Sequence, residues 1–438
     1  MVNLVCIIVM SVFTKKEIFL LLIGGILSAL SCVFCSDGGE SGNVSTPASM
    51  AISAVYIAIA FTLSLEQQLM LVALALPNTK ALGFYGISCS IIVCAIAVMM
   101  NLKKARNVSK ILLITFIYII YCTQFIGRFG DIKIGLVMPI KMGFNLLFFF
   151  ILASNYKLAS NSFNVGFKAT VALFVGIASA FWISFNQAET DATRVAIEGN
   201  DPNMLAVEAA FVISYLCVYY YNRKNFSKWL FLGAIVILSA ISFFCGSRMG
   251  LILIGFVVGS SILLNVGQIK RSSLLIVVFG GALLLFLLSS TGQAFLEAFL
   301  IRNENLESHG DISNHRFDLW AAYISVFNSD PILWFMGLGD YREYGILKQA
   351  HNFLIEDLAA YGIIGVSILY LTYRSIYVHQ YKFSKCLNSI KMGLFSKIPF
   401  LVPIIGGLTL HGLTSIINTT MLYLGVLCMT LPKKDMER

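Results

Sequence analysis

Charged side chains are scarce in this sequence. Lysine, arginine, aspartate and glutamate together make up only 12% of the 438 residues, whereas 58% are hydrophobic and the mean hydropathy is +0.83. A soluble domain normally carries about 25% charged residues. Apolar runs of roughly 18–20 residues, each long enough to cross a bilayer, recur along the chain. Because backbone in hydrocarbon must satisfy its own hydrogen bonds, these runs predict an all-α polytopic membrane protein.

The ten cysteines lack the companions that a metal or redox site needs. Cys32 and Cys35 form a CxxC pair, but no histidine or second pair accompanies them, and most of the other cysteines fall inside apolar runs. Packing is therefore the better interpretation of the cysteines. An acidic DxD motif, which would hold a divalent cation, is also missing. The sequence predicts a site with neither metal nor cofactor.

The positive charges gather in a few loops. The formal net charge is +9. The basic residues concentrate in the C-terminal tail and in segments 101–109, 222–228, 266–271 and 374–397. Alternation of the spans puts all of these on one side of the membrane, and the acid-rich loops on the other side are 36–48, 186–202 and 291–352. This is the positive-inside pattern, which predicts both termini in the cytoplasm and the bilayer, not nucleic acid, as partner.

The spans number about 12–14. The count depends on residues 68–77, which are short for a crossing but must cross or re-enter for the loops to alternate. The next span is expected at 81–100. Five regions follow: N-terminal transmembrane helices (1–185), an outer loop (186–202), helices with an outer Ser-Arg turn (203–290), a large periplasmic loop (291–352), and C-terminal helices with a cytoplasmic tail (353–438).

Only two outer loops have the length and chemistry for a site. The first ends in Asp201-Pro202, a good helix start with Asp201 as N-cap and Pro202 as the first helical residue. The second predicts an amphipathic helix over 314–328 lying on the outer membrane surface. Its expected apolar face consists of Phe317, Trp320, Ala321, Ile324 and Phe327.

Arginine is unexpected on the outer face, so the arginines there need a reason. The candidates are Arg194 in the first loop, Arg248 in the turn Gly246-Ser247-Arg248-Met249-Gly250, and Arg316 at the start of the predicted helix, whereas Arg128, Arg302 and Arg342 fit the solvated interpretation. A lone outer arginine is more often solvated or in contact with lipid headgroups. Arg248 differs because it is expected to be buried between two apolar helices, where a charge is costly and a functional role is the default.

His351 ends the long loop, just before an apolar helix. Asn352 is the better N-cap, which leaves His351 free, and Glu356 and Asp357 complement the helix dipole. Guanidinium groups match phosphate oxygens and can stabilise the charge of a departing diphosphate. Histidine, with an unperturbed pKa of about 6.5, can take a proton from a sugar hydroxyl at neutral pH. Together these residues predict a glycosyl-transfer site.

Four blocks of this sequence resemble family motifs in their order and spacing over residues 190–370. They are Arg194 with Asp201-Pro202-Asn203-Met204-Leu205-Ala206; Ser247-Arg248-Met249-Gly250; His315-Arg316-Phe317-Asp318-Leu319-Trp320; and Gly337-Leu338-Gly339 with His351-Asn352 and Gly362-Ile363-Ile364-Gly365. The chain is similar here to the bacterial O-antigen polymerase/ligase superfamily of the Wzy/WaaL type. Residues 1–185 match only as generic membrane helices.

This resemblance implies a metal-independent, inverting glycosyltransferase of the GT-C type. It would take an undecaprenyl-pyrophosphate-linked glycan as donor on the periplasmic side of the bacterial inner membrane. His351 would be the catalytic base, and Arg248 and Arg316 would hold the pyrophosphate. The residues that would contribute to substrate binding are Arg194, Asn203, Ser247 and Asn352.

The family motifs leave the reaction open between two activities. A polymerase passes the growing chain to the next lipid-linked repeat unit in lipopolysaccharide or capsule biosynthesis, and a chain-length regulator is a candidate partner. A ligase passes the finished chain to lipid A-core. The Phe-, Ile-, Asn- and Lys-rich composition favours the polymerase. The alternative from another class is a lipid-linked oligosaccharide transporter or flippase, which predicts internal repeats and a charged midplane cavity. Neither feature is evident in the sequence.

Overall fold

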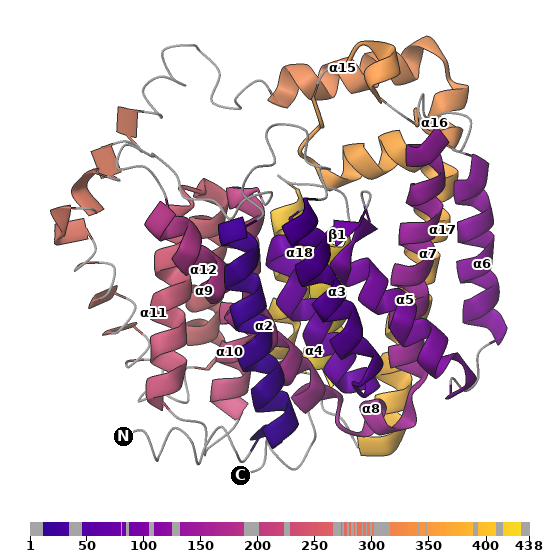
Figure 1. Ribbon diagram of the computed structural model, residues 1–438. Helices are drawn as coiled ribbons and strands as arrows, with labels where there is room; N and C mark the ends of the chain where they lie inside the picture. The colour runs from indigo at the N-terminus through magenta and orange to yellow at the C-terminus, as the bar shows by residue number, and fades with distance from the viewer. Residues whose placement is uncertain are drawn as a thin grey trace.

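The computed structural model describes most of the chain in helical form (Figure 1). The described residues are 12–34, 46–79, 81–84, 87–104, 109–124, 132–187, 201–222, 228–265, scattered positions between 273 and 301, 316–339, 341–346, 348–388, 393–408 and 415–430. Within these ranges all regular structure is helical except one two-stranded hairpin of β1 (Gly83–Phe84) and β2 (Ile87–Ser88). The strands are antiparallel, with Gly83 opposite Ser88 and Phe84 opposite Ile87.

The helices follow the order of the expected spans. In the first half they are α2 (Lys15–Phe34), α3 (Pro47–Phe61), α4 (Leu65–Ala75), η1 (Leu76–Asn78), α5 (Cys89–Asn101), η2 (Leu102–Lys104), α6 (Ser109–Thr123), α7 (Ile132–Ser154), α8 (Tyr156–Ser160) and α9 (Ser162–Gln187). In the second half they are α10 (Pro202–Asn222), α11 (Lys228–Phe244), α12 (Arg248–Leu264), α15 (Arg316–Ser329), α16 (Ile332–Met336), η5 (Tyr341–Tyr344), α17 (Phe353–Asn388), η6 (Phe395–Lys397), α18 (Ile398–Gly407) and α19 (Ile416–Cys428).

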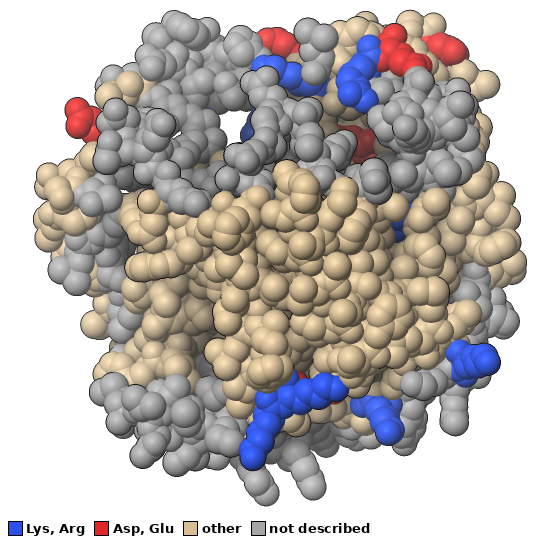
Figure 2. All heavy atoms as spheres, viewed as in Figure 1, with Lys and Arg blue, Asp and Glu red and all other residues tan. Residues whose placement is uncertain are grey.

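Length and apolar composition make this a polytopic membrane protein of the all-α class. Four helical segments in the described ranges are long enough to span a bilayer, and eight shorter apolar helices accompany them. Figure 2 shows a broad band nearly free of charged side chains across the visible face. Large apolar side chains point outward from the bundle helices, as with Trp229 at 80% and Leu263 at 74% exposure. Such exposure suits contact with lipid, because a soluble surface rarely carries large apolar patches.

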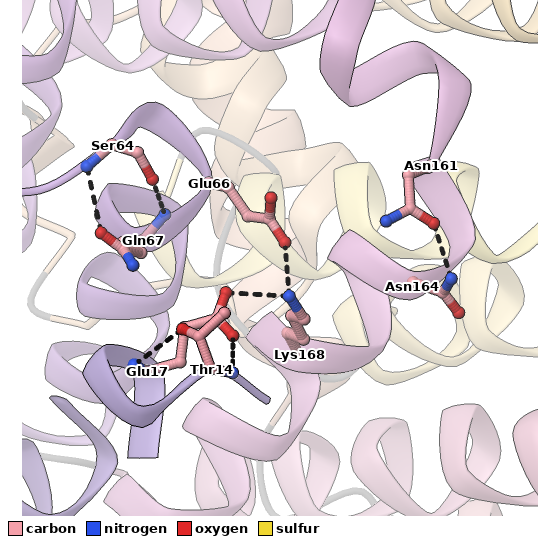
Figure 3. A network of polar contacts seen from close by, with 8 residues as sticks. All are labelled: Thr14, Glu17, Ser64, Glu66, Gln67, Asn161, Asn164 and Lys168. Carbon is pink, nitrogen blue, oxygen red and sulfur yellow. Dashed lines mark hydrogen bonds and ion pairs between the residues drawn. The ribbon is translucent and has the colours of Figure 1, made fainter. Parts of the chain in front are cut away.

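One end of the bundle is held by a charged network, drawn in Figure 3. The ammonium of Lys168 in α9 lies 2.8 Å from Glu17 Oε1 in α2 and 3.0 Å from Glu66 Oε1 in α4. Nearby, Lys16 Nζ donates to the Thr62 carbonyl at 2.7 Å, just past the end of α3. We call this the Lys168 end. It joins the beginnings of three helices to the end of a fourth, and no residue in it was singled out from the sequence.

The short segment 68–77 runs between the two ends of the bundle, and its crossing of the membrane stays a prediction. Its helix α4 begins at the Lys168 end beside Glu66 and is fully buried from Leu69 through η1. It ends near Ala81, whose carbonyl accepts a hydrogen bond from Ser49 at the start of α3. The following span was expected at 81–100, and its beginning was placed too early. Gly83–Phe84 and Ile87–Ser88 form the paired strands, so α5 begins at Cys89.

The opposite end carries the beginnings of α10 and α12, and we call it the Arg248 end. Helix α9 starts at the Lys168 end, and α10 follows it in sequence and packs against it. Gly250 in α12 lies so close to α10 that an added Cβ would meet the Ala206 Cβ at 2.4 Å. Only glycine allows this approach, which brings the first turn of α12 against the first turn of α10.

A separate cap lies above the Arg248 end, formed by α15, α16, η5 and the beginning of α17 (Figure 1). Its own hydrophobic cluster is centred on Tyr323, Phe327, Leu333 and Leu338. Helix α15 confirms the helix expected at 314–328. Of its expected apolar face, Phe327 is buried in the cap and Trp320 is partly buried, whereas Phe317 and Ile324 are exposed. The other α15 side chains that pack in the cap cluster are Leu319, Tyr323 and Val326. Contact of α15 with the membrane surface stays a prediction.

Candidate functional site

The cap fixes the segment that precedes His351. The indole Nε1 of Trp320 donates to the Ala350 carbonyl at 2.8 Å, and the Tyr323 hydroxyl donates to the Lys348 carbonyl at 3.1 Å. Both donors come from α15, whose first residue is Arg316. Two side chains of α15 therefore hold the backbone just before His351, the candidate base. Arg316 lies one turn before Trp320 on the same helix.

His351 has a left-handed backbone, with φ of 50°. Among the described residues it is the only non-glycine with a positive φ. Such a conformation costs free energy in an L-residue and is found preferentially at functional positions. Its backbone N–H donates to Glu356 Oε1 at 2.9 Å, and its side chain is half-buried. Glu356 thus anchors the turn at His351, which goes beyond the dipole role expected from the sequence.

Asn352 caps α17, as expected. Its Oδ1 accepts from the N–H groups of Leu354 at 3.0 Å and Ile355 at 3.4 Å, and the residue is buried. Asp357, one turn further, is 5% exposed and interacts electrostatically with Tyr118 of α6 and Tyr373 of α17. Its dipole role stays a prediction.

Glycines explain how α17 can leave the cap and enter the bundle. Gly362 interrupts the helix with φ 62° and ψ 179°, and Gly337 packs directly against it with φ 82°. A Cβ on Gly337 would lie 2.7 Å from the Gly362 nitrogen. The helix break frees the Tyr361 carbonyl, which accepts a hydrogen bond from the Tyr121 hydroxyl of α6 at 2.6 Å. The two glycine blocks at 337–339 and 362–365 therefore contact each other through Gly337 and Gly362.

Arg248 is the first residue of α12, in the tight turn that the sequence predicts. Gly246 has a φ of 60°, and the buried Ser247 caps the helix by accepting from the Gly250 N–H at 3.2 Å. The expectation that Arg248 is buried was wrong, because its side chain is exposed. Ser247 and Gly250 are the buried residues of this turn, whereas the Arg248 side chain is exposed at the beginning of α12.

Arg248, Arg316 and Asp201 form one electrostatic cluster. Burial lowers the pKa of the Arg316 guanidinium, the positive charge of Arg248 lowers it further, and the Asp201 carboxylate opposes both. Arginine remains charged through such a shift because its ordinary pKa is far above neutrality. The charges of Arg248 and Asp201 therefore both act on the Arg316 guanidinium.

Asp201 and Asn203 shape the beginning of α10. Asp201 Oδ1 accepts from the backbone N–H of Asn203 at 2.8 Å and from its Nδ2 at 3.0 Å, and Pro202 is the first helical residue. The expected helix start is confirmed. The predicted substrate contacts of Asn203, Ser247 and Asn352 stay predictions, since the contacts described here are structural. Arg194 and His315 lie outside the described residues.

Sequence reasoning named Trp320, on the apolar face and in the block with Arg316, but not its hydrogen bond to a distant carbonyl. It missed Tyr323 and Tyr121, which also donate to distant carbonyls. In the described ranges no group of three or more His, Cys, Asp or Glu side chains is arranged to hold a metal ion. The arrangement can bind an anion at the arginines and move a proton at the histidine.

Comparison with known proteins adds a family to this geometry. Residues 233–370 match the family described as O-antigen ligase. Over these residues the chain is similar to the O-antigen polymerase/ligase superfamily. The matched segment contains Arg248, Arg316, the contact of Gly337 with Gly362, and His351, whereas Asp201 precedes it. A comparison with curated proteins finds no match. The family supports a polymerase- or ligase-type function in the membrane and does not separate the two.

Proposed function

We propose that this protein is a surface-polysaccharide polymerase of the O-antigen type. It joins undecaprenyl-pyrophosphate-linked repeat units on the periplasmic side of the inner membrane by metal-independent, inverting glycosyl transfer. The observation that supports this proposal is the clustering of Arg248 and Arg316, from distant parts of the chain, near a helix that also holds the His351 segment. The Arg248 end then faces the periplasm, and the basic Lys168 end faces the cytoplasm.

The arginines would hold the diphosphate of the donor. Two like charges in one site repel each other, so the cluster gains stability when an anion enters. A guanidinium offers paired N–H donors that match phosphate oxygens, and it keeps its charge at any working pH. As the bond from the sugar to the diphosphate breaks, its electron pair goes to the leaving oxygen. Arg248 and Arg316 stabilise that developing negative charge.

His351 would activate the acceptor. Its imidazole removes the proton from a sugar hydroxyl of the acceptor, and the resulting oxygen nucleophile attacks the anomeric carbon opposite the departing diphosphate. This attack inverts the configuration at that carbon and leaves the proton on His351, which releases it to water. The hydrogen bond from Trp320 to the Ala350 carbonyl and that from the His351 N–H to Glu356 hold the backbone that carries the imidazole. Such preorganisation raises the rate of a two-substrate reaction.

An O-antigen ligase is the second candidate, because the family described as O-antigen ligase covers the same residues. The two activities differ only in acceptor, a lipid-linked repeat unit or lipid A-core. A gel of lipopolysaccharide from a strain lacking this protein separates them. Core bearing one repeat unit is the result expected for a polymerase. Bare core would show a ligase, and an accumulation of donor on the cytoplasmic face would show a transporter.

A further inference from the structure

Helix α16, the short helix of the cap, carries large apolar side chains that are exposed. Ile332 is 60% exposed and Phe335 is 52% exposed, and a spacing of three positions puts them on one face of the helix. The other side of α16 belongs to the cap, because Leu333 is buried in its hydrophobic cluster and Trp334 packs against that cluster. Asp330, exposed at the start of α16, accepts from the Ile332 N–H at 3.1 Å. Helix α16 therefore has an apolar outer face with a charged residue at one end.

This outer face meets the outward side of α17. The Phe335 carbonyl lies against Gly362, the position at which α17 turns from the cap into the bundle. The next two residues of α17, Ile363 and Ile364, are again large, apolar and exposed. The exposed apolar side chains of the cap and those of the bundle thus adjoin each other at this contact.

Helix α6 shows where this contact lies relative to the bundle. Tyr121, in the last turn of α6, donates to the Tyr361 carbonyl at 2.6 Å, one residue before Gly362. In the same part of α6, Ile117 and Ile120 are exposed in the way that suits contact with lipid. Figure 1 shows α16 at the edge of the cap where α17 turns down beside α6. The apolar face of α16 therefore lies at the upper limit of the lipid-facing surface.

We propose that α16 inserts its apolar face into the leaflet on the cap side of the bilayer and docks the cap on the membrane. Ile332 and Phe335 would lie among the upper acyl-chain segments, and Asp330 among the headgroups. Transfer of these side chains out of water is favourable in proportion to their apolar area. An interfacial helix typically buries its apolar face about 5–10 Å into the boundary between headgroups and acyl chains. The proposal does not depend on the proposed function.

Docking through α16 would set the height of the candidate base above the bilayer. Leu333 of α16 packs in the same cluster as Tyr323, whose hydroxyl holds the Lys348 carbonyl. The Leu338 N–H, just after α16, donates to the Ala359 carbonyl of α17 at 2.6 Å. A membrane contact at α16 is thereby transmitted to the segment before His351 through packed side chains and a backbone hydrogen bond.

The cap and the bundle supply matched controls. Ile120 of α6 is an exposed apolar residue of the bundle and represents a position in lipid. Ile324 of α15 is an exposed apolar residue of the cap on another helix. If exposure alone decided the surroundings of a cap residue, Phe335 and Ile324 would behave alike. The proposal requires that Phe335 behave like Ile120.

The test uses full-length protein in nanodiscs and two quenchers of a fluorophore attached to a single introduced cysteine. The variants are Ile332→Cys, Phe335→Cys, Ile120→Cys and Ile324→Cys. The cysteines among the described residues are buried, and wild-type protein treated in the same way supplies the background labelling. One quencher is a lipid with a nitroxide near the top of its acyl chain, and the other is iodide in the water.

Quenching by the nitroxide lipid at positions 332 and 335 is expected to be within about twofold of that at 120 and at least about threefold stronger than at 324. Iodide is expected to show the reverse order. Nitroxide quenching at 335 no stronger than at 324 would overturn the proposal. Strong iodide quenching at 332 and 335 would overturn it in favour of a solvent-exposed helix. Protection of both positions from both quenchers would overturn it in favour of a second protein copy covering α16.

Discussion

The indole N–H of Trp320 and the carbonyl of Ala350 are joined by a 2.8 Å hydrogen bond, which connects the helix carrying Arg316 to the residue before His351. An indole N–H can donate a hydrogen bond but cannot accept one, so Trp320 must be the donor and the Ala350 carbonyl the acceptor. The bond makes the candidate base and a candidate diphosphate ligand parts of the same rigid cap, although 35 positions of sequence separate Arg316 from His351.

Trp320→Phe removes this donor and keeps an aromatic ring. A hydrogen bond of this type contributes about 0.5–1.5 kcal/mol, so transfer is expected to fall by roughly tenfold while the amount of protein in the membrane stays constant. Trp334→Phe is the matched control, because Trp334 packs in the same cap and stacks on Phe327. The quantity to measure is the rate of glycan transfer by each purified variant. Equal activity of the two variants would refute a role for the Trp320 bond.

Arg248→Lys and Arg316→Lys preserve charge and remove the two-pronged guanidinium. Each substitution is expected to lower transfer at least about tenfold, because an ammonium does not pair with diphosphate oxygens in the same geometry. Arg342→Lys, in the exposed η5 turn of the cap, serves as the control and is expected to be nearly neutral. Fully active Arg248→Lys protein would reassign this residue to packing or solvation at the helix end.

Gly362→Ala tests the contact that sets the direction of α17. The position has a φ of 62°, and a Cβ there would collide with the Phe335 carbonyl. For alanine, the left-handed backbone conformation alone costs about 1–2 kcal/mol. The cap is therefore expected to detach, and transfer is expected to be lost. Gly255→Ala in α12 is the control, since no atom lies near its added Cβ. Limited proteolysis of the cap distinguishes the variants, and equal protection of both would count against the helix-break account.

Lys168→Met tests the network at the opposite end. The substitution leaves the carboxylates of Glu17 and Glu66 without their cation, and breaking a buried ion pair costs about 3–5 kcal/mol. The thermal unfolding midpoint in detergent is expected to fall, and Lys168→Arg is expected to restore most of it. Adding Glu17→Gln and Glu66→Gln to Lys168→Met should also recover stability, because no uncompensated charge then remains. A midpoint unaffected by Lys168→Met would show that the network is dispensable.

Local chemistry in the sequence predicted much of the fold. Asp201-Pro202 and Asn352 were correctly identified as helix starts because a cap acts on residues two or three positions away. The apolar runs predicted the helices because they too can be recognised within a short stretch of sequence. The hairpin at 83–88 was missed because its residues continue an apolar run, so only the pairing of Gly83 with Ser88 ends the span.

Long-range features could not be derived in this way. Lys168 lies 102 and 151 residues from its two carboxylate partners, and nothing near it in sequence indicates either one. The sequence did not predict that Tyr323 packs with Phe327 in the cap while Phe317 and Ile324 stay exposed. Which set packs depends on Leu333 and Leu338 of the following segments. The prediction that Arg248 is buried was wrong because Ser247 and Gly250 occupy the buried positions of this turn.

The central claim is that the imidazole of His351 performs proton transfer in glycosyl transfer, and His351→Asn tests it most directly. Asparagine tolerates the left-handed backbone at this position, so the variant removes the imidazole while preserving the turn. The measurement is transfer from the extracted lipid-linked oligosaccharide by purified full-length protein, with binding of undecaprenyl pyrophosphate as the check on folding. We predict that transfer falls by at least about a hundredfold while binding is retained. Near-normal transfer by the asparagine variant would contradict the account.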